Sequence, residues 1–467
     1  MVRPKTSEKG WKDYHSVWII LFIAWAMCYL DRAITGPVIS WMIANDIALI
    51  EGVYEPHAVG GLIGSMFFAG YMLTQFPAGF LGDRYGRRTM LVISTVWAGV
   101  ATILSGMARG LNAFVAARVL TGLGEGAYYS NDRALVAQVT PPGKVGTGMG
   151  VVFVGLAVGL TTATVTAPWL IEMAEGFMGR AAWSFPFLLF GPPTVLVGLI
   201  MQHRLPADAK GSYRGALPRL LAYSFFFLLA IMGIFQLSIS LRLGVLWQTA
   251  LVLLIALVLV GLIYSRIGSS SAPVLRDRSL LLMYVSAIPI LFTLWFFGFW
   301  ALLVVSESSG LGLSGAALYA GLFGLANAIG YPLGGVVCDR IPGIAGRKRL
   351  YALFCATVAT LIALMVPSTQ AEDLATMAIL LFLIGMAFAA MQTVHMTLTA
   401  DLSPPDKLGQ SFGMWNLVAE FGALLSPVIC GYLRDATGSW DAAIVLTSAL
   451  LLASAALVVL VPRAVRY

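Results

Sequence analysis

Long apolar stretches without charged residues recur along the whole chain, and they decide which fold classes are open to it. Residues 220–240 and 244–265, for example, contain no Asp, Glu, Lys or Arg. About 18 or more such residues in a row can cross a bilayer as a helix. Only 11% of the residues are charged and 59% are hydrophobic, whereas a soluble domain has roughly 25% charged residues. A soluble enzyme, a disordered chain and a disulfide scaffold are therefore excluded.

The chain is expected to be an all-α integral membrane protein with fourteen transmembrane helices. The apolar segments lack the alternation of a transmembrane β-strand and are about twice its length. The expected helices run near residues 15–41, 59–81, 90–108, 112–138, 147–171, 182–202, 220–240, 244–265, 279–305, 314–337, 350–367, 374–400, 410–432 and 441–462. The first segment is too long for the apolar core of a signal peptide, so it is expected to remain as a span.

The basic residues are distributed unevenly between the two sides of the membrane. Four of the 29 Lys and Arg residues fall in loops on one side, namely Arg109, Arg180, Arg242 and Arg434, and three fall inside helices. The other 22 lie on the side of the two termini. Because Lys and Arg are enriched in cytoplasmic loops, both termini are predicted to be cytoplasmic, in the cell (inner) membrane. The net charge of +7 is explained by this asymmetry and requires no nucleic-acid partner.

Two pairs of motifs indicate that the chain is built from two related halves. Asp83-Arg84 and Asp339-Arg340 follow the second and tenth expected helices, and Pro141-Pro142 and Pro404-Pro405 follow the fourth and twelfth. Internal repeats of this kind are typical of transporters. We expect an N-terminal half (residues 1–203), a linker with an inserted transmembrane hairpin (204–278) and a C-terminal half (279–467). The hairpin should pack outside the twelve-helix core and contribute nothing to a central cavity.

The most specific string of residues lies in the loop after the second helix. It reads Gly79-Phe80-Leu81-Gly82-Asp83-Arg84-Tyr85-Gly86-Arg87-Arg88. Small residues allow two helix ends to approach each other, and the Asp and Arg side chains could form a charge latch. The string resembles the loop signature of the major facilitator superfamily, and the resemblance covers the whole chain except the hairpin. It implies the fold of that superfamily, and it implies that Asp83, Arg84, Arg87, Asp339 and Arg340 act in gating. The alternative is a basic turn that only sets the topology.

Charged residues also lie inside the first and fourth expected helices. The first contains Tyr29-Leu30-Asp31-Arg32, and the fourth contains Arg118, Glu125 and Asp132 at intervals of seven residues, followed by Arg133. Seven residues are nearly two helical turns, so the spaced charges would form one stripe. Charged groups at this depth are costly and usually face a cavity or a partner. A purely structural set of ion pairs is the alternative.

These two helices resemble those of the anion:cation symporters, a group that includes bacterial sugar-acid transporters. The resemblance rests on Tyr-x-Asp-Arg in the first helix, on Arg-x6-Glu and Tyr-x-x-Asn-Asp-Arg in the fourth, and on the segment Trp415 to Gly422. It implies that Arg32 meets the substrate anion, that Asp31 and Glu125 carry protons, and that Arg118 pairs with Glu125. Asp132 departs from the Asn that relatives usually have, and we count it among the proton-coupling candidates.

Further polar and aromatic residues are candidates for contact with a substrate. They are Tyr29, Tyr71, Gln75, Tyr128, Tyr129, Arg133, Trp295, Gln392, His395 and Asn416. A lone histidine in a membrane helix is more often a satisfied hydrogen-bonding group than a functional one, and membrane aromatics more often pack against neighbours. Both alternatives stay open for His395 and Trp295.

The leading prediction is a secondary active transporter that couples protons to the symport of a small organic anion, such as a sugar acid or carboxylate, by alternating access. Within the helices Arg32, Arg118 and Arg133 balance Asp31, Glu125 and Asp132. Protonation of two of these carboxylates would leave an excess of positive charge for an anion. The expected partners are the anion, protons and the bilayer, and the protein is expected to act as a monomer.

Three alternatives remain. A transporter of an amphipathic or zwitterionic substrate, such as a lysolipid, siderophore or drug, could act as an exporter, and the same fold could serve as a sensor that transports nothing. A membrane enzyme is disfavoured because the four His residues lie on separate segments and no catalytic loop is evident. The four cysteines have no metal-ligand spacing, and neither a metal nor another cofactor is expected.

Overall fold

The computed structural model is a bundle of long helices in which the part of the chain that it describes contains no strand. It describes residues 11–46, 55–141, 144–208, 211–265, 272–404 and 407–462. The all-α membrane fold is therefore confirmed. Pro142 and Pro405, the second residues of one repeated motif, lie outside the described residues.

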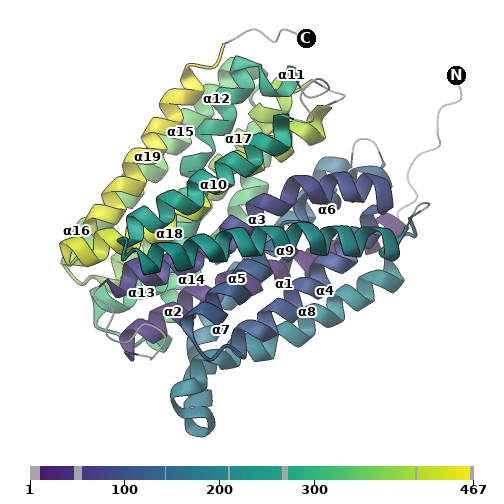
Figure 1. Ribbon diagram of the computed structural model, residues 1–467. Coiled ribbons are helices and arrows are strands. Elements are labelled where there is room, and N and C mark those ends of the chain that lie inside the picture. The colour runs from purple at the N-terminus through teal and green to yellow at the C-terminus, as the bar shows by residue number, and fades with distance from the viewer. Residues whose placement is uncertain are drawn as a thin grey trace, which may run out of the picture.

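The N-terminal half contains six membrane-spanning units, which can be followed in Figure 1. Their helices are α1 (Asp13–Ala33) with α2 (Thr35–Ala44), α3 (Pro56–Tyr85), α4 (Arg87–Gly106), α5 (Leu111–Glu125) with α6 (Tyr129–Val139), α7 (Val145–Met178) and α8 (Phe185–Arg204); the 3₁₀ helix η1 (Gly179–Ser184) joins the last two.

The C-terminal half also contains six units, and two helices lie between the halves. The inserted helices are α9 (Tyr213–Ser240) and α10 (Val245–Ser265), followed by the short α11 (Ala272–Leu275). The C-terminal units are α12 (Arg278–Ser286) with α13 (Ile288–Ser309), α14 (Leu313–Asp339), α15 (Gly343–Ala363) with α16 (Met365–Gln370), α17 (Leu374–Leu402), α18 (Leu408–Thr437) and α19 (Asp441–Val459). The total of fourteen spanning units in the described chain matches the prediction.

Four of these units are broken helices, and proline accounts for three of the breaks. Pro37, Pro289 and Pro367 each lie two or three residues after the residue at which the helix is interrupted, Ile34, Ala287 and Leu364. Proline lacks the N–H of the helical ladder and its ring clashes with the carbonyl four residues earlier. The break between α5 and α6 contains no proline. It falls at Gly126–Tyr128, where the chain continues as a turn.

The inserted hairpin packs on the outside of the two halves, as predicted. In Figure 1, α9 runs across the front of the N-terminal half. It contacts α3, α4 and α5, whereas α10 contacts α3, α9 and α18 and so touches both halves. Large apolar side chains such as Phe225 and Trp247 are 63% and 69% exposed, as expected of helices that face lipid. Because α10 bridges α3 and α18, the hairpin is positioned to move with either half.

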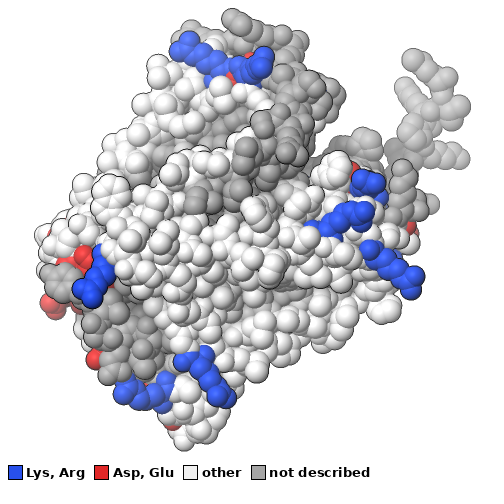
Figure 2. Space-filling view, viewed as in Figure 1, with Lys and Arg blue, Asp and Glu red and all other residues white. Residues whose placement is uncertain are grey.

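The described ends of the chain lie on the same side of the membrane, because the number of spanning units is even. We call the face with the start of α1 and the end of α19 the terminal face, and the face with the end of α2 and the start of α3 the distal face. In Figure 2 the surface between these faces carries no charge over the described residues, and the blue Lys and Arg side chains gather near the ends of the helices. This uncharged belt is the surface that meets the hydrocarbon of a bilayer.

The two halves are joined in the distal part of the molecule. In the ranges that the structure describes, side-chain hydrogen bonds between the halves link His57 to Asp435 and Glu307, Ser65 to the Leu424 carbonyl, and Trp169 to the Ser314 carbonyl. Glycines bring α3 and α18 together there, since a Cβ on Gly61 would lie 2.2 Å from the Pro427 oxygen and a Cβ on Gly431 would lie 2.3 Å from the His57 oxygen. Small residues are the usual means of close helix packing in membranes. The structure is therefore closed at its distal face.

Candidate functional site

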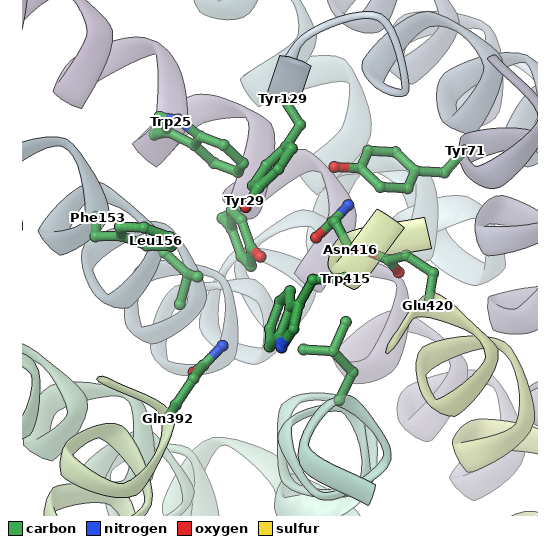
Figure 3. A pocket seen from close by; sticks show the side chains of 11 residues that line it. Trp25, Tyr29, Tyr71, Tyr129, Phe153, Leu156, Gln392, Trp415, Asn416 and Glu420 are labelled. Atoms are coloured by element: carbon green, nitrogen blue, oxygen red, sulfur yellow. The ribbon is translucent and has the colours of Figure 1, made fainter. Parts of the chain in front are cut away.

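A small cavity lies between the two halves, near the middle of the helices (Figure 3). Its lining residues are Trp25, Tyr29, Tyr71, Tyr129, Phe153 and Leu156 from the N-terminal half and Leu291, Gln392, Trp415, Asn416 and Glu420 from the C-terminal half. Its volume is about 20 Å³, counted as the space open to the centre of a water molecule. One water needs about 10–15 Å³ by this measure, so the cavity has closed to less than the size of an organic substrate.

Arg32 lies directly behind the aromatic wall of this cavity. Its side chain is buried and donates from Nη2 and Nε to Glu125 Oε2, at 2.8 and 3.2 Å. The guanidinium carbon also lies 4.6 and 4.4 Å from the ring centres of Tyr29 and Tyr71, both of which line the cavity. Desolvated cation–π contacts of this kind are favourable. The ion pair is thus one side-chain layer away from the cavity.

The predicted pairing of Arg118 with Glu125 is wrong in this conformation. Arg118 donates instead to the carbonyl of Asp31, at 3.2 Å, and to Ser105 Oγ, at 3.5 Å. The pairing was implied by the resemblance to the anion:cation symporters, but in this structure Arg32 reaches Glu125 from α1 and forms the ion pair instead. Arg118 still stabilises the charge of Glu125 from a greater distance.

Asp31 points away from the cavity although it adjoins Arg32 in the sequence. Its carboxylate is fully buried and faces Thr102 of α4, Thr194 of α8 and the guanidinium of Arg118. Adjacent residues on a helix point in different directions, so the side chains of Asp31 and Arg32 lie in different environments. Asp31 therefore communicates with the cavity only through Arg118, Glu125 and Arg32.

A second group of charges surrounds Asp132 at the start of α6. The Trp25 indole N–H donates to Asp132 Oδ2, and Arg133 Nε lies 3.4 Å from Asp132 Oδ1. The Arg133 guanidinium lies 4.0 Å from the ring centre of Phe153, which lines the cavity as Trp25 does. In Figure 3 Trp25 and Phe153, which contact this group, lie on the side of the cavity opposite to Tyr71 and Glu420.

The break between α5 and α6 separates these two groups. Because the helix is interrupted after Glu125, Asp132 does not continue the stripe formed by Arg118 and Glu125. The glycines of this segment bring α3 close, since a Cβ on Gly122 would lie 2.0 Å from the Phe67 oxygen and one on Gly126 would lie 2.3 Å from the Tyr71 oxygen. The glycines thus allow α3 to approach this segment closely, and the predicted single stripe is wrong.

The structure brings about half of the predicted substrate-contact residues to the cavity. Tyr29, Tyr71, Tyr129, Gln392 and Asn416 line it, and Arg32 and Arg133 lie behind the wall. Gln75, Tyr128, Trp295 and His395 do not line it. Their environments explain why.

Three of the four predicted residues off the wall are held by neighbouring side chains or carbonyls, whereas Gln75 is buried with its Nε2 unpaired in the described part of the chain. Trp295 is buried between Tyr29, at a ring distance of 6.1 Å, and Phe68, at 4.8 Å. His395 accepts from the Trp415 indole at 3.0 Å and bonds Ser286 Oγ at 2.8 Å, so both ring nitrogens are satisfied. The Tyr128 hydroxyl donates to the Leu21 carbonyl at 3.4 Å. Gln75 is buried one turn beyond Tyr71 on α3.

Four polar or aromatic residues of the wall were not predicted as substrate contacts. They are Trp25, Phe153, Trp415 and Glu420. A signal for the last two was present, because Trp415, Asn416 and Glu420 share one helix and Asn416 was itself a candidate. Residues three or four apart lie on the same helix face, so Glu420 follows from Asn416.

The loops predicted to act in gating lie at the terminal face. Arg87 Nη2 donates to Asp83 at 2.6 Å, although the Asp83 side chain is 66% exposed, and Arg84 lies over the Tyr85 ring. In the C-terminal half Asp339 and Arg340 are exposed. The ion pair there joins Arg347 of α15 to Asp401 of α17, at 2.5 Å. A metal site is not evident, since no group of three or more His, Cys, Asp or Glu residues in the described ranges could hold an ion.

Comparisons with known proteins give consistent similarities over the full length of the chain. A family model described as the Major Facilitator Superfamily matches residues 21–320 and 297–466. The probable sulfoacetate transporter of Cupriavidus necator is 24% identical over 445 residues, which cover 94% of this chain and 92% of that protein. The D-galactonate transporter of Escherichia coli is 22% identical over 482 residues and is covered to 98%, as is this chain. A solved bacterial homologue of the human lysosomal transporter Spinster has a similar fold, with a TM-score of 0.68, 15% identity and 97% of each chain covered.

Proposed function

The chain belongs to the Major Facilitator Superfamily of transporters, and we propose that it imports a small organic anion together with protons by alternating access. The substrate class is a sugar acid, a carboxylate or a similar small anion. The names of two full-length relatives, a sulfoacetate and a D-galactonate transporter, support this class. The driving force is the proton gradient, with no cofactor or metal.

The observation that carries the proposal is the buried pair of Arg32 and Glu125 behind the cavity wall. A guanidinium binds carboxylate and sulfonate groups through two parallel N–H bonds, and Glu125 holds that position in this structure. An entering anion would replace Glu125 as the partner of Arg32. Tyr29 and Tyr71 cover the guanidinium, so their rings would have to move aside as the cavity opens.

Proton coupling follows from competition for the same guanidinium. While Glu125 is ionised it occupies Arg32, and leaving either charge buried without its partner costs several kcal/mol. A proton on Glu125 removes that competition and frees Arg32 for the anion. Loss of the proton on the other side of the membrane would restore the ion pair and expel the anion. Asp31 and Arg118, which lie behind the pair of Arg32 and Glu125, would compensate the change of charge at Glu125.

Direction and location are part of the proposal. The charge asymmetry supports a cytoplasmic terminal face in the inner membrane, and the closed distal face would then be the outer gate of a monomer. The bonds of His57 to Asp435 and Glu307 would break when the protein opens outward. The state described here would be the one in which the outer gate has closed.

Uptake by purified protein in liposomes tests the proposal. We expect accumulation of labelled D-galactonate, sulfoacetate or another small organic acid when the outside is acidic, and its loss when a protonophore collapses the gradient. Accumulation that ignores the gradient would contradict proton coupling. Transport of lysolipids or zwitterions and of no anion, or transport only in the opposite gradient, would favour the amphipathic or exported substrate instead.

A further inference from the structure

Glu420 of α18 is a carboxylate of the C-terminal half that reaches the cavity wall. The residue is 3% exposed and lines the cavity together with Asn416, one turn earlier on the same helix. In the part of the chain that the structure describes, Glu420 Oε2 and Asn416 Nδ2 have no hydrogen-bond partner. Figure 3 shows both side chains at the edge of the space enclosed by Tyr29 and Tyr71. An acceptor and a donor are thus available at the point where the two halves face each other.

The surroundings of Glu420 offer it no dedicated cation. The charged and titratable groups that face it are Tyr29 and Arg32 of α1, Tyr71 of α3, Glu125 of α5 and Tyr129 of α6, while α13 contributes Leu291 and α17 contributes Gln392. Arg32 is already bonded to Glu125 and lies behind the Tyr29 and Tyr71 rings. A buried ionised carboxylate without a partner is strongly unfavourable.

Glu420 also changes the charge balance of the centre. Arg32, Arg118 and Arg133 are matched by Asp31, Glu125 and Asp132, and all six lie in the N-terminal half. Glu420 is a seventh group and the fourth carboxylate, so a fully ionised centre carries one negative charge. This charge would repel an anion in a site of low dielectric constant. A neutral Glu420 removes the repulsion and supplies an O–H donor to the anion.

We propose that Glu420 takes up a proton from the distal side before the anion binds and is the proton-coupling residue of the C-terminal half. The proton adds to a carboxylate oxygen, stays there while the anion occupies the cavity and leaves to the terminal side with it. The inference rests on the proposed function in one respect, that the substrate is an anion. It adds a proton site on the half that moves relative to Arg32 and Glu125.

Infrared difference spectroscopy of the protein in lipid, between mildly acidic and mildly alkaline buffer, tests the proton site without any substrate. The wild type should lose a carboxylic-acid C=O band on alkalinisation, and Glu420→Gln should lack that band. Glu420→Asp should restore it at a shifted frequency. Glu172→Gln, the same change at an exposed residue of α7, should leave the wild-type spectrum unchanged. If the spectrum of Glu420→Gln equals that of the wild type, Glu420 does not gain or lose a proton between the two buffers and the inference is wrong.

The second measurement is the pH dependence of D-galactonate binding. Each proton that must bind before the ligand makes the affinity fall by up to about tenfold per pH unit above its titration. Glu420→Gln should lower the slope of log Kd against pH by about one, and Glu420→Asp should retain the slope. An unchanged slope in Glu420→Gln would count against the inference. If no organic anion binds or is transported, the proposed function fails, while the infrared result still decides whether Glu420 is protonated.

Discussion

The two walls of the cavity come from the two six-unit halves and carry different chemistry. The N-terminal wall is aromatic, and behind it lie three arginines and three carboxylates. The C-terminal wall offers the amides of Gln392 and Asn416 and the single carboxylate of Glu420. The two halves thus have the same number of spanning units, whereas the charged groups near the cavity are concentrated in the N-terminal one.

Residues at equivalent positions of the two halves illustrate the difference in charge. When the halves are aligned on the motifs Pro141-Pro142 and Pro404-Pro405, Phe388 takes the position of Glu125 and His395 takes that of Asp132. Phe388 is fully buried and packs against Phe323, at a ring distance of 5.8 Å, and His395 is held by Trp415 and Ser286. These residues complete the packing of the C-terminal half. We infer that the N-terminal half holds and releases the anion, and that the C-terminal half closes over it.

The largest effect should follow from removing the cation of the N-terminal wall. Arg32→Ala leaves Glu125 buried without its partner, a change that costs roughly 3–5 kcal/mol in comparable pairs. In the proposed function it also removes the group that meets the anion. Binding should weaken by at least about 100-fold, which corresponds to about 2.7 kcal/mol, and uptake should disappear. Isothermal titration of purified protein with D-galactonate measures the loss.

The control for this variant is Arg109→Ala, which removes an exposed arginine at the distal face and should bind the anion as the wild type does. Retention of normal affinity in Arg32→Ala would show that the anion meets Arg133 or the C-terminal amides instead. The N-terminal wall would then not supply the cation that binds the anion through Arg32, and this part of the comparison between the walls would be wrong.

Glu125→Gln should separate binding from coupling. The amide mimics the protonated acid at nearly constant volume, so the anion should still bind and exchange across the membrane at equal pH. Accumulation driven by a proton gradient should fall to the level seen without a gradient. Paired assays of gradient-driven uptake and counterflow measure the two activities, with Glu175→Gln at an exposed position as the control. Gradient-driven accumulation by Glu125→Gln would make Glu125 structural and move the coupling to Asp31 or Asp132.

His57→Ala should loosen the contact at which the two halves meet. Both ring nitrogens of His57 face carboxylates, Asp435 at 2.6 Å and Glu307 at 3.2 Å. Hydrogen bonds to charged groups contribute about 1.5–3 kcal/mol each, so their loss should favour the state that is open at the distal face by roughly tenfold or more.

Spin labels at the exposed residues Arg109 and Ala371, one on each half, would report this change as a larger population at long distance. His203→Ala, at an exposed position on the terminal face, should leave the distance distribution unchanged. An unaltered distribution in His57→Ala would mean that the glycine contacts between α3 and α18 hold the distal face closed by themselves.

The sequence predicted the framework of this molecule better than its centre. The count of spanning units is confirmed, because length and hydropathy determine it. The hairpin packs outside the two halves, as expected, and the match to a family of transporters confirms that the chain is not an enzyme. The partner of Glu125 depends on how α1 and α5 rotate against each other, which no spacing within one helix reveals. No proline marks the break after Glu125, so the sequence did not predict it. Glu420 lies in the segment Trp415 to Gly422, but the charge balance considered the N-terminal half alone and left it out.

The smallest effect should come from Asp83→Asn at the terminal face. At this face it is the C-terminal half, and not the N-terminal half, that has the stronger charged contacts. There the C-terminal half has the better ion pair, Arg347 with Asp401, whose side chains are 18% and 28% exposed, whereas Asp83 is 66% exposed and meets only Arg87 on the next turn. Exposed pairs contribute about 0–1 kcal/mol, so Asp83→Asn should slow turnover by no more than about fivefold. Affinity should not change, because Asp83 lies twelve residues beyond Tyr71, about 18 Å along α3.

Asp401→Asn should have the larger effect on turnover and should also lower the melting temperature, since it leaves Arg347 partly buried without its partner. The measurements are the uptake rate, Kd and thermal unfolding of both variants in the same lipid. A parallel loss of affinity and rate in Asp83→Asn would place this loop in contact with the cavity in another conformation, and an effect larger than that of Asp401→Asn would mean that the N-terminal loop is the main latch after all.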